Sequence, residues 1–298
     1  MAVLFIFIDG IGVGNNSSDN PLANQQLQLF SLFTGRNGFH NECKIREKEN
    51  LLYKPIDANL GVEGLPQSGT GQVALFSGIN ASEMIGKHFG PFPYSTTKPI
   101  LENDSLFHKT IEIGKRPHFL NAYPEIFFQK SKKRDRWTCT TLMAKSSGVE
   151  LNGLEEIKNR KALTAEIIQK AWRELLGIDV PEITINEASQ RVLNSLKEYD
   201  LVLYEYYLTD KAGHEMNRDK ADYVLRVIDD FLMGIIKTLS EDDTLVITSD
   251  HGNIEDLKTK SHTRNPVPLF VKGNIEPFKK AESIMDITPA IMKVLSDE

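Results

Sequence analysis

The stretch Thr244-Leu245-Val246-Ile247-Thr248-Ser249-Asp250-His251-Gly252-Asn253 joins a short apolar run to a polar turn. Its first half is apolar or β-branched without alternation, which is typical of a strand buried on both faces. Asp250 and His251 follow at once, and neighbouring side chains at a strand end splay apart unless the chain turns. Gly252 supplies that turn. The stretch therefore predicts a buried strand that ends in two potential metal ligands.

Three other runs have the same character, at residues 2–8 (AVLFIFI), 201–206 (LVLYEY) and 267–271 (VPLFV). Segments with helical spacing of apolar residues lie at 186–199, at 220–239 and from Asp286 onward. Strands that alternate with helices pair in parallel through right-handed crossovers. We therefore expect an α/β fold, a mostly parallel sheet with helices on both faces.

The middle of the chain has a different texture. It carries a dense basic cluster (Lys130, Lys132, Lys133, Arg134 and Arg136) and one predicted helix at 160–176. We expect residues 1–94 and 182–298 to form the α/β core, and residues 95–181 to form a small inserted cap region. The alternative is that this segment is simply more of a single domain.

Composition excludes several classes of protein. Among 298 residues, 35 Lys and Arg face 41 Asp and Glu, for a net charge of −6, which argues against nucleic acid or an anionic membrane as a partner. The two cysteines, Cys43 and Cys139, exclude a disulfide framework and a cysteine metal cluster. The apolar start of the chain is too short to span a bilayer. We expect a cytoplasmic protein; the sequence does not indicate its oligomeric state.

More polar side chains accompany the other predicted strands. Asp9 follows the first strand, Asp210 and His214 lie four residues apart beyond the second, and His262 precedes the last. The carboxyl ends of parallel strands meet at one sheet edge, where ligands bind. Alone, each residue has an ordinary explanation, because such an Asp is usually a cap or turn former and a single His usually lies at the surface. Together they predict one convergent site.

A convergent site of this composition needs cations. Three crowded carboxylates repel one another unless a positive ion neutralises them. Carboxylate and imidazole ligands without thiolate suit Zn²⁺ or Mn²⁺ better than Ca²⁺ or Mg²⁺ alone. The three Asp and three His are too many for one open catalytic ion, so we expect two divalent cations.

A glycine-rich loop at residues 65–72 (LPQSGTGQ) leads into a predicted helix. Ser68 has two interpretations. It is either the helix N-cap, or a hydroxyl nucleophile placed where free N–H groups favour a bound phosphate. A coordinated metal would lower the pKa of such a hydroxyl and activate it.

These motifs together resemble the alkaline phosphatase superfamily of two-metal phosphoryl-transfer enzymes. The chain is most similar to the branch of cofactor-independent phosphoglycerate mutases and phosphopentomutases. The matching pieces occur in the family's order: Asp9-Gly10, the loop 67–72, Asp210 with His214, residues 250–253, and His262 with 266–268 behind it. The Asp-His-Gly-Asn element is the most specific of them.

The resemblance implies a role for each matched position. One ion is held by Asp9, Ser68, Asp250 and His251, and the other by Asp210, His214 and His262. Ser68 is the implied catalytic nucleophile, and Thr70 in the same loop is the second candidate.

The implied activity is two-metal-dependent phosphoryl transfer on a small phosphorylated metabolite through a phosphoserine. Transfer to water makes a phosphatase, and transfer to a substrate hydroxyl makes a mutase. Substrate-binding candidates are Arg264, Lys115 with Arg116, and the basic cluster, which is otherwise a solvated loop. The chain is considerably shorter than the phosphoglycerate mutases, and their substrate-binding arginines have no clear match in it. The alternative is a non-catalytic relative that binds metal or a phosphorylated metabolite, although every implied ligand position is filled.

Overall fold

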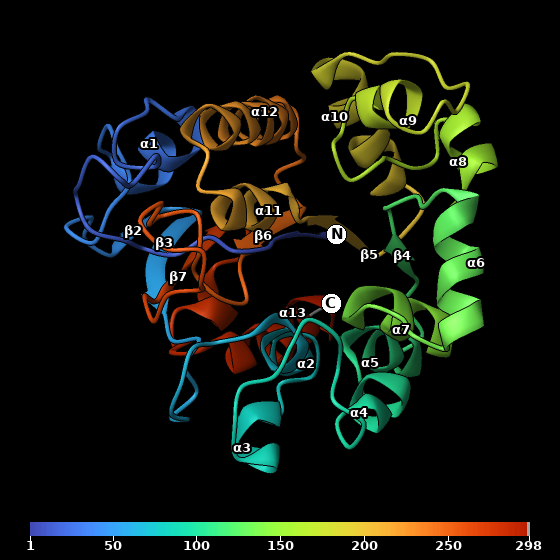
Figure 1. Ribbon diagram of the computed structural model, residues 1–298, viewed down its shortest axis with the longest axis horizontal. Coiled ribbons are helices and arrows are strands. Elements are labelled where there is room, and N and C mark those ends of the chain that lie inside the picture. Colours follow the sequence, from blue (N-terminus) through green and yellow to red (C-terminus); the bar gives the residue numbers. More distant parts are fainter. Residues whose placement is uncertain (297–298) are drawn as a thin grey trace.

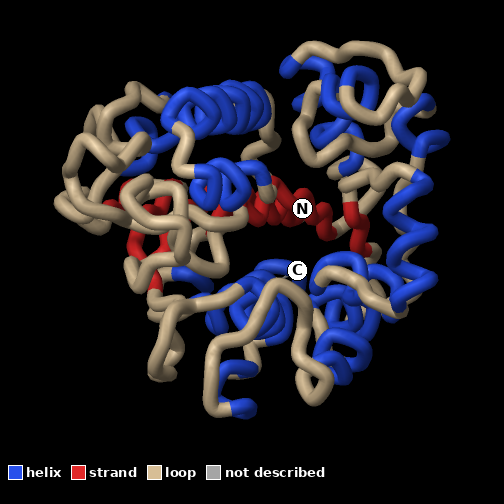
Figure 2. Tube along the Cα trace, viewed as in Figure 1, coloured by secondary structure: helices blue, strands red, loops and turns tan. Residues whose placement is uncertain are grey.

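The computed structural model describes residues 1–296, in which seven strands form one sheet between two layers of helices (Figures 1 and 2). The strand order is β2-β3-β7-β6-β1-β5-β4. The strands are β1 (Val3–Ile8), β2 (Arg46–Lys48), β3 (Leu51–Ile56), β4 (Pro117–Phe119), β5 (Leu201–Tyr206), β6 (Thr244–Thr248) and β7 (Val267–Lys272). The predicted α/β fold with helices on both faces is confirmed.

Most of the sheet is parallel, but β7 is not. β6, β1, β5 and β4 pair in parallel, whereas β7 pairs antiparallel with both β6 and β3. The predicted mostly parallel sheet thus includes one strand at 267–271 that runs antiparallel to both of its neighbours. A parallel pair needs a crossover, usually a helix, and the connection from β6 to β7 contains none. The start of β7 consequently lies at the same sheet edge as the carboxyl ends of its neighbours.

Two cores explain why the apolar runs do not alternate. Side chains of a strand point to opposite faces in turn. Leu4 and Ile6 of β1 join one buried cluster, and Phe5 and Phe7 join the other. The first cluster packs against the layer of α1, α10, α11 and α12, and the second against α2, α5, α7 and α13 (Figure 1).

The helices vary widely in length. They are α1 (Gln28–Thr34), α2 (Ser68–Ser77), α3 (Ala81–Ile85), α4 (Lys98–Asn103), α5 (Leu106–Glu112), α6 (Glu125–Arg134), α7 (Cys139–Ser146), α8 (Leu154–Lys158), α9 (Lys170–Glu174), α10 (Ile185–Ser195), α11 (Leu208–Glu215), α12 (Arg218–Ile236) and α13 (Ile287–Ser296). The helices predicted at 186–199, 220–239 and the C-terminal end are confirmed as α10, α12 and α13. The single helix predicted at 160–176 is wrong. Positive φ angles at Arg160, Ile167 and Gln169 interrupt it, and only α9 is helical there.

The middle segment contributes directly to the sheet. β4 pairs with β5, and Phe107 and Met143 are buried in the same cluster as Phe5. Much of residues 95–181 is thus continuous with the core, while α8 and α9 surround a small separate cluster that includes Ile157 and Trp172. The predicted boundaries of a cap region stay a prediction.

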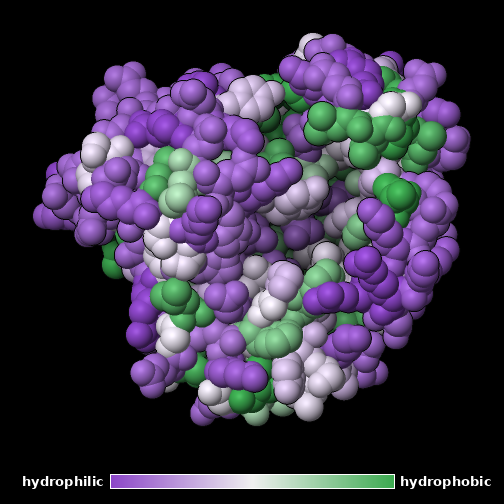
Figure 3. Space-filling model, viewed as in Figure 1, coloured by the Kyte–Doolittle hydropathy of each residue, from purple (hydrophilic) through white to green (hydrophobic). Residues whose placement is uncertain are grey.

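The surface is mostly hydrophilic on the face shown in Figure 3. Among residues 1–296, no helix combines the length and the apolar character needed to cross a bilayer.

Candidate metal centre

The ends of three adjacent strands bring the predicted aspartates together. Asp9 follows β1, and its N–H donates to the Tyr206 carbonyl at the end of β5 (3.0 Å). Asp250 follows β6, and Asp210 lies in the first turn of α11, just beyond β5. Gly10 between them has φ +72°, and a Cβ there would lie 2.8 Å from the Asp210 backbone. Only glycine allows this close approach.

His251 gathers the first group of side chains around one nitrogen atom. Its Nε2 lies 2.9 Å from Ser68 Oγ, 3.3 Å from Asp9 Oδ1 and 3.6 Å from Asp250 Oδ2. All four side chains are buried. The structure therefore places the four predicted ligands of one ion in direct contact.

The second group surrounds Asp210. Its two carboxylate oxygens lie 3.2 Å from His214 Nε2 and 3.5 Å from His262 Nε2, and these two imidazole nitrogens are 3.2 Å apart. The rings of His251 and His262 stack with centroids 3.7 Å apart, so the two groups are contiguous. Ligand atoms of Asp210, His251 and His262 also lie within 4.8 Å of one another. His251 thus stands between the two predicted sets.

Backbone carbonyls orient the histidines. His262 Nδ1 lies 2.7 Å from the Pro66 carbonyl oxygen, and His214 Nδ1 lies 2.5 Å from that of Lys260. A carbonyl accepts only from a protonated nitrogen, so Nδ1 carries the hydrogen in both rings. Each Nε2 faces the centre, where it would bind a metal once it has no proton.

Ser68 is the first residue of α2, and its hydroxyl points to His251 rather than to the helix backbone. The N-cap position belongs to Gln67, so the N-cap interpretation of Ser68 is wrong. The Thr70 hydroxyl, the second candidate nucleophile, is engaged by backbone instead. It donates to the Gln67 carbonyl (3.4 Å) and accepts from the Phe89 N–H (3.2 Å).

The ionisation of the site is strongly perturbed. Burial, reinforced by Asp250, raises the pKa of Asp9 well above its usual value, and burial with Asp210 raises the pKa of Asp250 to about 7. Burial lowers the pKa of His251 to about 4. Burial opposes ionisation of Asp210 too, but the hydrogen bond from His214 lowers its pKa to about 2. Crowded carboxylates beside the neutral rings of His251 and His262 leave the site without enough positive charge to balance its acidic groups.

Unsatisfied hydrogen-bond acceptors also indicate that the site lacks a cation. Within the described part of the chain, Asp9 Oδ1 and Asp250 Oδ1 are buried with no hydrogen-bond donor. Such atoms are rare in native proteins unless an ion or water completes them. Carboxylate oxygens and neutral imidazoles are suitable ligands for Zn²⁺ or Mn²⁺. The residues present therefore fit a pair of divalent cations.

Three polar residues near the centre were missed in the sequence. Gln72 Nε2 donates to Asp250 Oδ2 (3.2 Å) and to Asp9 Oδ2 (3.5 Å). Glu205 of β5 is buried and accepts from Thr140 Oγ1 (2.7 Å), and burial raises its pKa to about 7. An acidic residue inside the apolar run LVLYEY was the available signal for Glu205.

The predicted substrate-binding cations lie in different places. Lys115 and Arg116 precede β4, whose first residue, Pro117, pairs with Leu201 at the start of β5. They therefore lie at the opposite, amino-terminal edge of the sheet, and their predicted role at this centre is wrong. Arg264 is exposed and donates through Nε to Asn59 Oδ1 (3.4 Å).

The basic cluster divides into two parts. Lys132, Lys133 and Arg134 are exposed in the last turn of α6. Arg136 instead holds its guanidinium 3.9 Å from the centroid of the Phe92 ring.

Comparison with known proteins agrees with this geometry. Residues 176–297 match the family model described as the Metalloenzyme superfamily. This part of the chain is therefore similar to that superfamily. The matched region contains five of the seven predicted metal-ligand positions, and Asp9 and Ser68 lie outside it. The five are Asp210, His214, Asp250, His251 and His262.

The chain is also similar over part of its length to curated phosphoglycerate mutases. It is 33% identical over 129 residues to the 2,3-bisphosphoglycerate-independent phosphoglycerate mutase of Clostridium kluyveri, and 32% identical over 128 residues to that of Acetivibrio thermocellus. Each match covers 40% of this chain and 25% of the relative. The matched region thus spans about a quarter of the length of these relatives.

Solved structures share the whole fold. The alkaline phosphatase of the Antarctic bacterium TAB5 superposes with a TM-score of 0.58 at 14% identity, covering 100% of this chain and 98% of that one. The phosphoglycerate mutase of Leishmania mexicana gives a TM-score of 0.54 at 11% identity, covering 100% and 95%. The predicted resemblance to the alkaline phosphatase superfamily, on the side of the phosphoglycerate mutases, is confirmed.

Proposed function

We propose that this chain is a two-metal-dependent phosphoryl-transfer enzyme that acts on a small phosphorylated metabolite through a phosphoserine at Ser68. The observation that carries the proposal is the position of the Ser68 hydroxyl, 2.9 Å from His251 Nε2 inside the carboxylate and imidazole group. The relatives named as phosphoglycerate mutases and alkaline phosphatases support the substrate class.

The proposed ligand sets follow the two contiguous groups. Asp9, Ser68, Asp250 and His251 hold one ion, and Asp210, His214 and His262 hold the other, with Mn²⁺ or Zn²⁺ as the candidate metals. When bound, a pair of such ions neutralises a phosphate and lowers the pKa of a serine hydroxyl. The proposed cytoplasmic location rests only on composition.

The residues around Ser68 prepare it for attack on phosphorus. The amino end of α2 carries a positive partial charge that favours a phosphate. A Cβ at Gly69 would lie 2.2 Å from the Phe92 carbonyl oxygen, so the loop that carries Phe92 packs directly on this helix start. Gln72 fixes Asp9 and Asp250 with its amide, which keeps both carboxylates aimed at the centre.

The acceptor of the phosphoryl group decides between phosphatase and mutase. Water at the phosphoserine yields hydrolysis, and a substrate hydroxyl yields transfer. The non-catalytic alternative is less supported, because a degenerate relative usually loses its nucleophile or a ligand and all seven positions are present here.

Assays with added metal test the proposal directly. We expect Mn²⁺ or Zn²⁺ to support hydrolysis of p-nitrophenyl phosphate or turnover within a panel of sugar and glycerate phosphates. Intact-mass analysis of the protein after reaction should reveal a phosphorylated serine. If elemental analysis finds two ions per chain and no substrate turns over, the non-catalytic alternative is correct.

Arg264 and Arg136 are the proposed substrate contacts. Arg136 has more structural support than Arg264. Its guanidinium stacks on the Phe92 ring, and the Phe92 backbone packs against Gly69 at the start of α2. Cys139, three residues further on, donates through Sγ to the Gly69 carbonyl (3.6 Å), which ties this segment to the start of α2. A guanidinium held there suits a carboxylate or second phosphate of a substrate.

Arg136→Gln is expected to raise KM about tenfold for glycerate phosphates, since it removes a charge-assisted contact to the far end of the substrate. Hydrolysis of p-nitrophenyl phosphate, which has no second anionic group, should change little. Arg134→Gln, with the same charge change in the last turn of α6, is the control. Equal KM values for wild type and Arg136→Gln would remove Arg136 from the binding site.

A further inference from the structure

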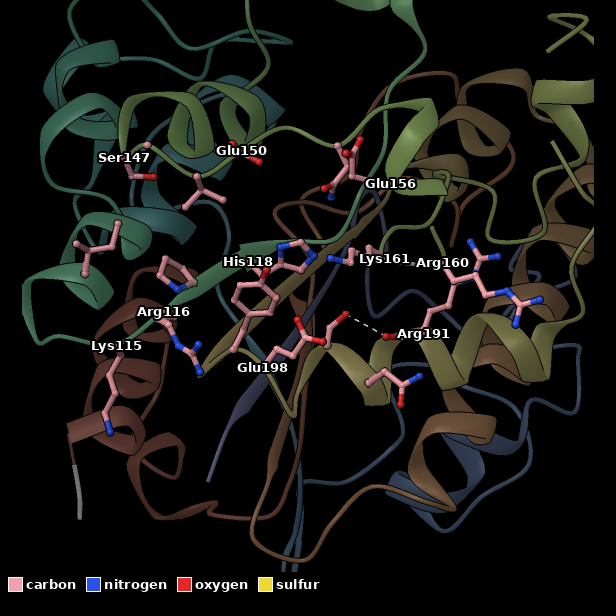
Figure 4. A pocket seen from close by; sticks show the side chains of 18 residues that line it. Lys115, Arg116, His118, Ser147, Glu150, Glu156, Arg160, Lys161, Arg191 and Glu198 are labelled. Atoms are coloured by element: carbon pink, nitrogen blue, oxygen red, sulfur yellow. Dashed lines mark hydrogen bonds between the residues drawn. The ribbon is translucent and has the colours of Figure 1, made fainter. Parts of the chain in front are cut away.

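A cavity of about 590 Å³ opens at the amino-terminal edge of the sheet, away from the metal centre (Figure 4). Its lining comes from the start of β4, the loop after α8 and the side of α10. Tyr199 in its wall precedes β5, whereas Asp210 follows that strand. The whole length of β5 therefore separates this cavity from the candidate metal centre.

Positive charge is concentrated around the cavity. Five cationic side chains line it from three separate segments: Lys115, Arg116, Arg160, Lys161 and Arg191. Three acidic residues also line it, and one of them, Glu156, is engaged by the Gly153 N–H (2.8 Å). Glu187 pairs with Arg191 Nη2 (3.0 Å) and lies 3.8 Å from Arg160 Nε, yet the cations still outnumber the acidic groups, in contrast with the net charge of −6 for the chain. Cations brought together from separate segments create a local field that attracts anions.

His118 of β4 forms part of the wall and is only 8% exposed. Its ring stacks on Tyr199 with centroids 4.4 Å apart and an interplanar angle of 12°. Among residues 1–296, its Nε2 has no hydrogen-bond partner. Burial lowers its pKa to about 4, against a hydrogen bond with the Lys161 backbone that raises it, so the ring is uncharged at neutral pH. Figure 4 places His118 among the labelled side chains, with Lys161 to one side and Arg116 to the other.

Arg191 is the fixed cation of the site. It is 3% exposed, and its Nη1 donates to the Ala162 carbonyl (3.0 Å) and to Gln169 Oε1 (2.9 Å). Its Nε is buried and, in the described chain, has no acceptor. A buried guanidinium held by the backbone is pre-organised, so little side-chain freedom is lost when an anion binds nearby.

We infer that this cavity is a second binding site, for a small phosphorylated anion, distinct from the metal centre. The volume lies in the range of small-molecule sites. Lysine and arginine side chains supply the charge-assisted hydrogen bonds that phosphate oxygens favour. His118 Nε2 and Arg191 Nε are buried without a hydrogen-bond partner in the described chain. A basic surface that is merely solvated would not contain such atoms.

Calorimetric titration of the full chain with pyrophosphate and with inorganic phosphate tests the site, first in chelator and then with Mn²⁺. We expect one binding event per chain in chelator, because this cavity needs no metal, and added phosphate binding once Mn²⁺ is present. The double variant with Arg116→Gln and Lys161→Gln should weaken the chelator-stable event about tenfold or more. Both side chains are exposed, so the fold should be unaffected. Lys197→Gln, outside this lining, is the matched control.

Two results would overturn the inference: no binding in chelator, or equal affinity in the wild type and the double variant. Lys161→Glu is the second variant, and charge reversal should weaken binding further than Lys161→Gln. Turnover of p-nitrophenyl phosphate should be the same in the double variant and the wild type. Failure of the proposed function would instead appear as absent turnover with the chelator-stable event intact.

Discussion

Ser68→Ala is expected to lower kcat for phosphomonoesters by about a thousandfold or more, because it removes the hydroxyl that we propose forms the covalent intermediate. The Ser68 side chain is small and its hydroxyl contacts His251 rather than the helix backbone, so the substitution should leave the fold and Tm nearly unchanged. Steady-state kinetics with p-nitrophenyl phosphate give the rate, and intact-mass analysis should show that the phosphorylated form is lost.

Thr70→Ala is the control that decides between the two hydroxyls of the loop. Thr70 bonds only to the backbone of Gln67 and Phe89, so its loss should affect stability, by about 1 kcal/mol, more than kcat. Full activity in Ser68→Ala together with an inactive, folded Thr70→Ala would transfer the nucleophile to Thr70. Activity in both variants would exclude a serine or threonine intermediate from this loop.

The core strands could be predicted because their apolar runs are buried on both faces. β1, β5 and β6 lie at the centre of the sheet, where each side chain enters one of two cores. β3 escaped prediction because Lys54 and Pro55 interrupt its run at the outer part of the sheet. The direction of β7 depends on what joins it to β6, and apolar residues alone do not carry that information.

The site was predictable to the extent that it follows strand ends. Asp9, Asp210 and Asp250 each come just after a central strand, so their convergence is a consequence of the fold. Glu205 and Thr140 meet across 65 residues, and no local pattern links them. Lys115 and Arg116 were misplaced because composition does not tell at which edge of the sheet a charge lies.

Asp250→Asn is expected to change stability in opposite directions with and without metal. In the metal-free protein at pH 8, burial and Asp210 oppose ionisation of Asp250, whose pKa is raised to about 7. A carboxyl with a raised native pKa binds its proton more tightly when folded, so stability falls as pH rises from about 4 toward 7. Asparagine removes that charge at constant shape, and the metal-free variant should be more stable than the wild type by about 2 kcal/mol at pH 8.

The metal-loaded protein should show the reverse, because an amide gives the proposed ion no negative charge. Asp250→Asn should then bind about one ion per chain instead of two, lose turnover, and melt below the loaded wild type. At pH 5 the metal-free difference should nearly vanish, since the wild-type Asp250 is itself largely protonated there. Asp242→Asn, an exposed substitution just before the first residue of β6, should alter none of these quantities.

A metal-free Asp250→Asn variant less stable than wild type at pH 8 would mean that Asp250 stabilises the fold without a cation, and the two-ion proposal would fail. Buried carboxylates that repel one another destabilise the metal-free fold, and a bound cation removes that repulsion. Differential scanning fluorimetry across pH and metal concentration measures the effect as a change in Tm.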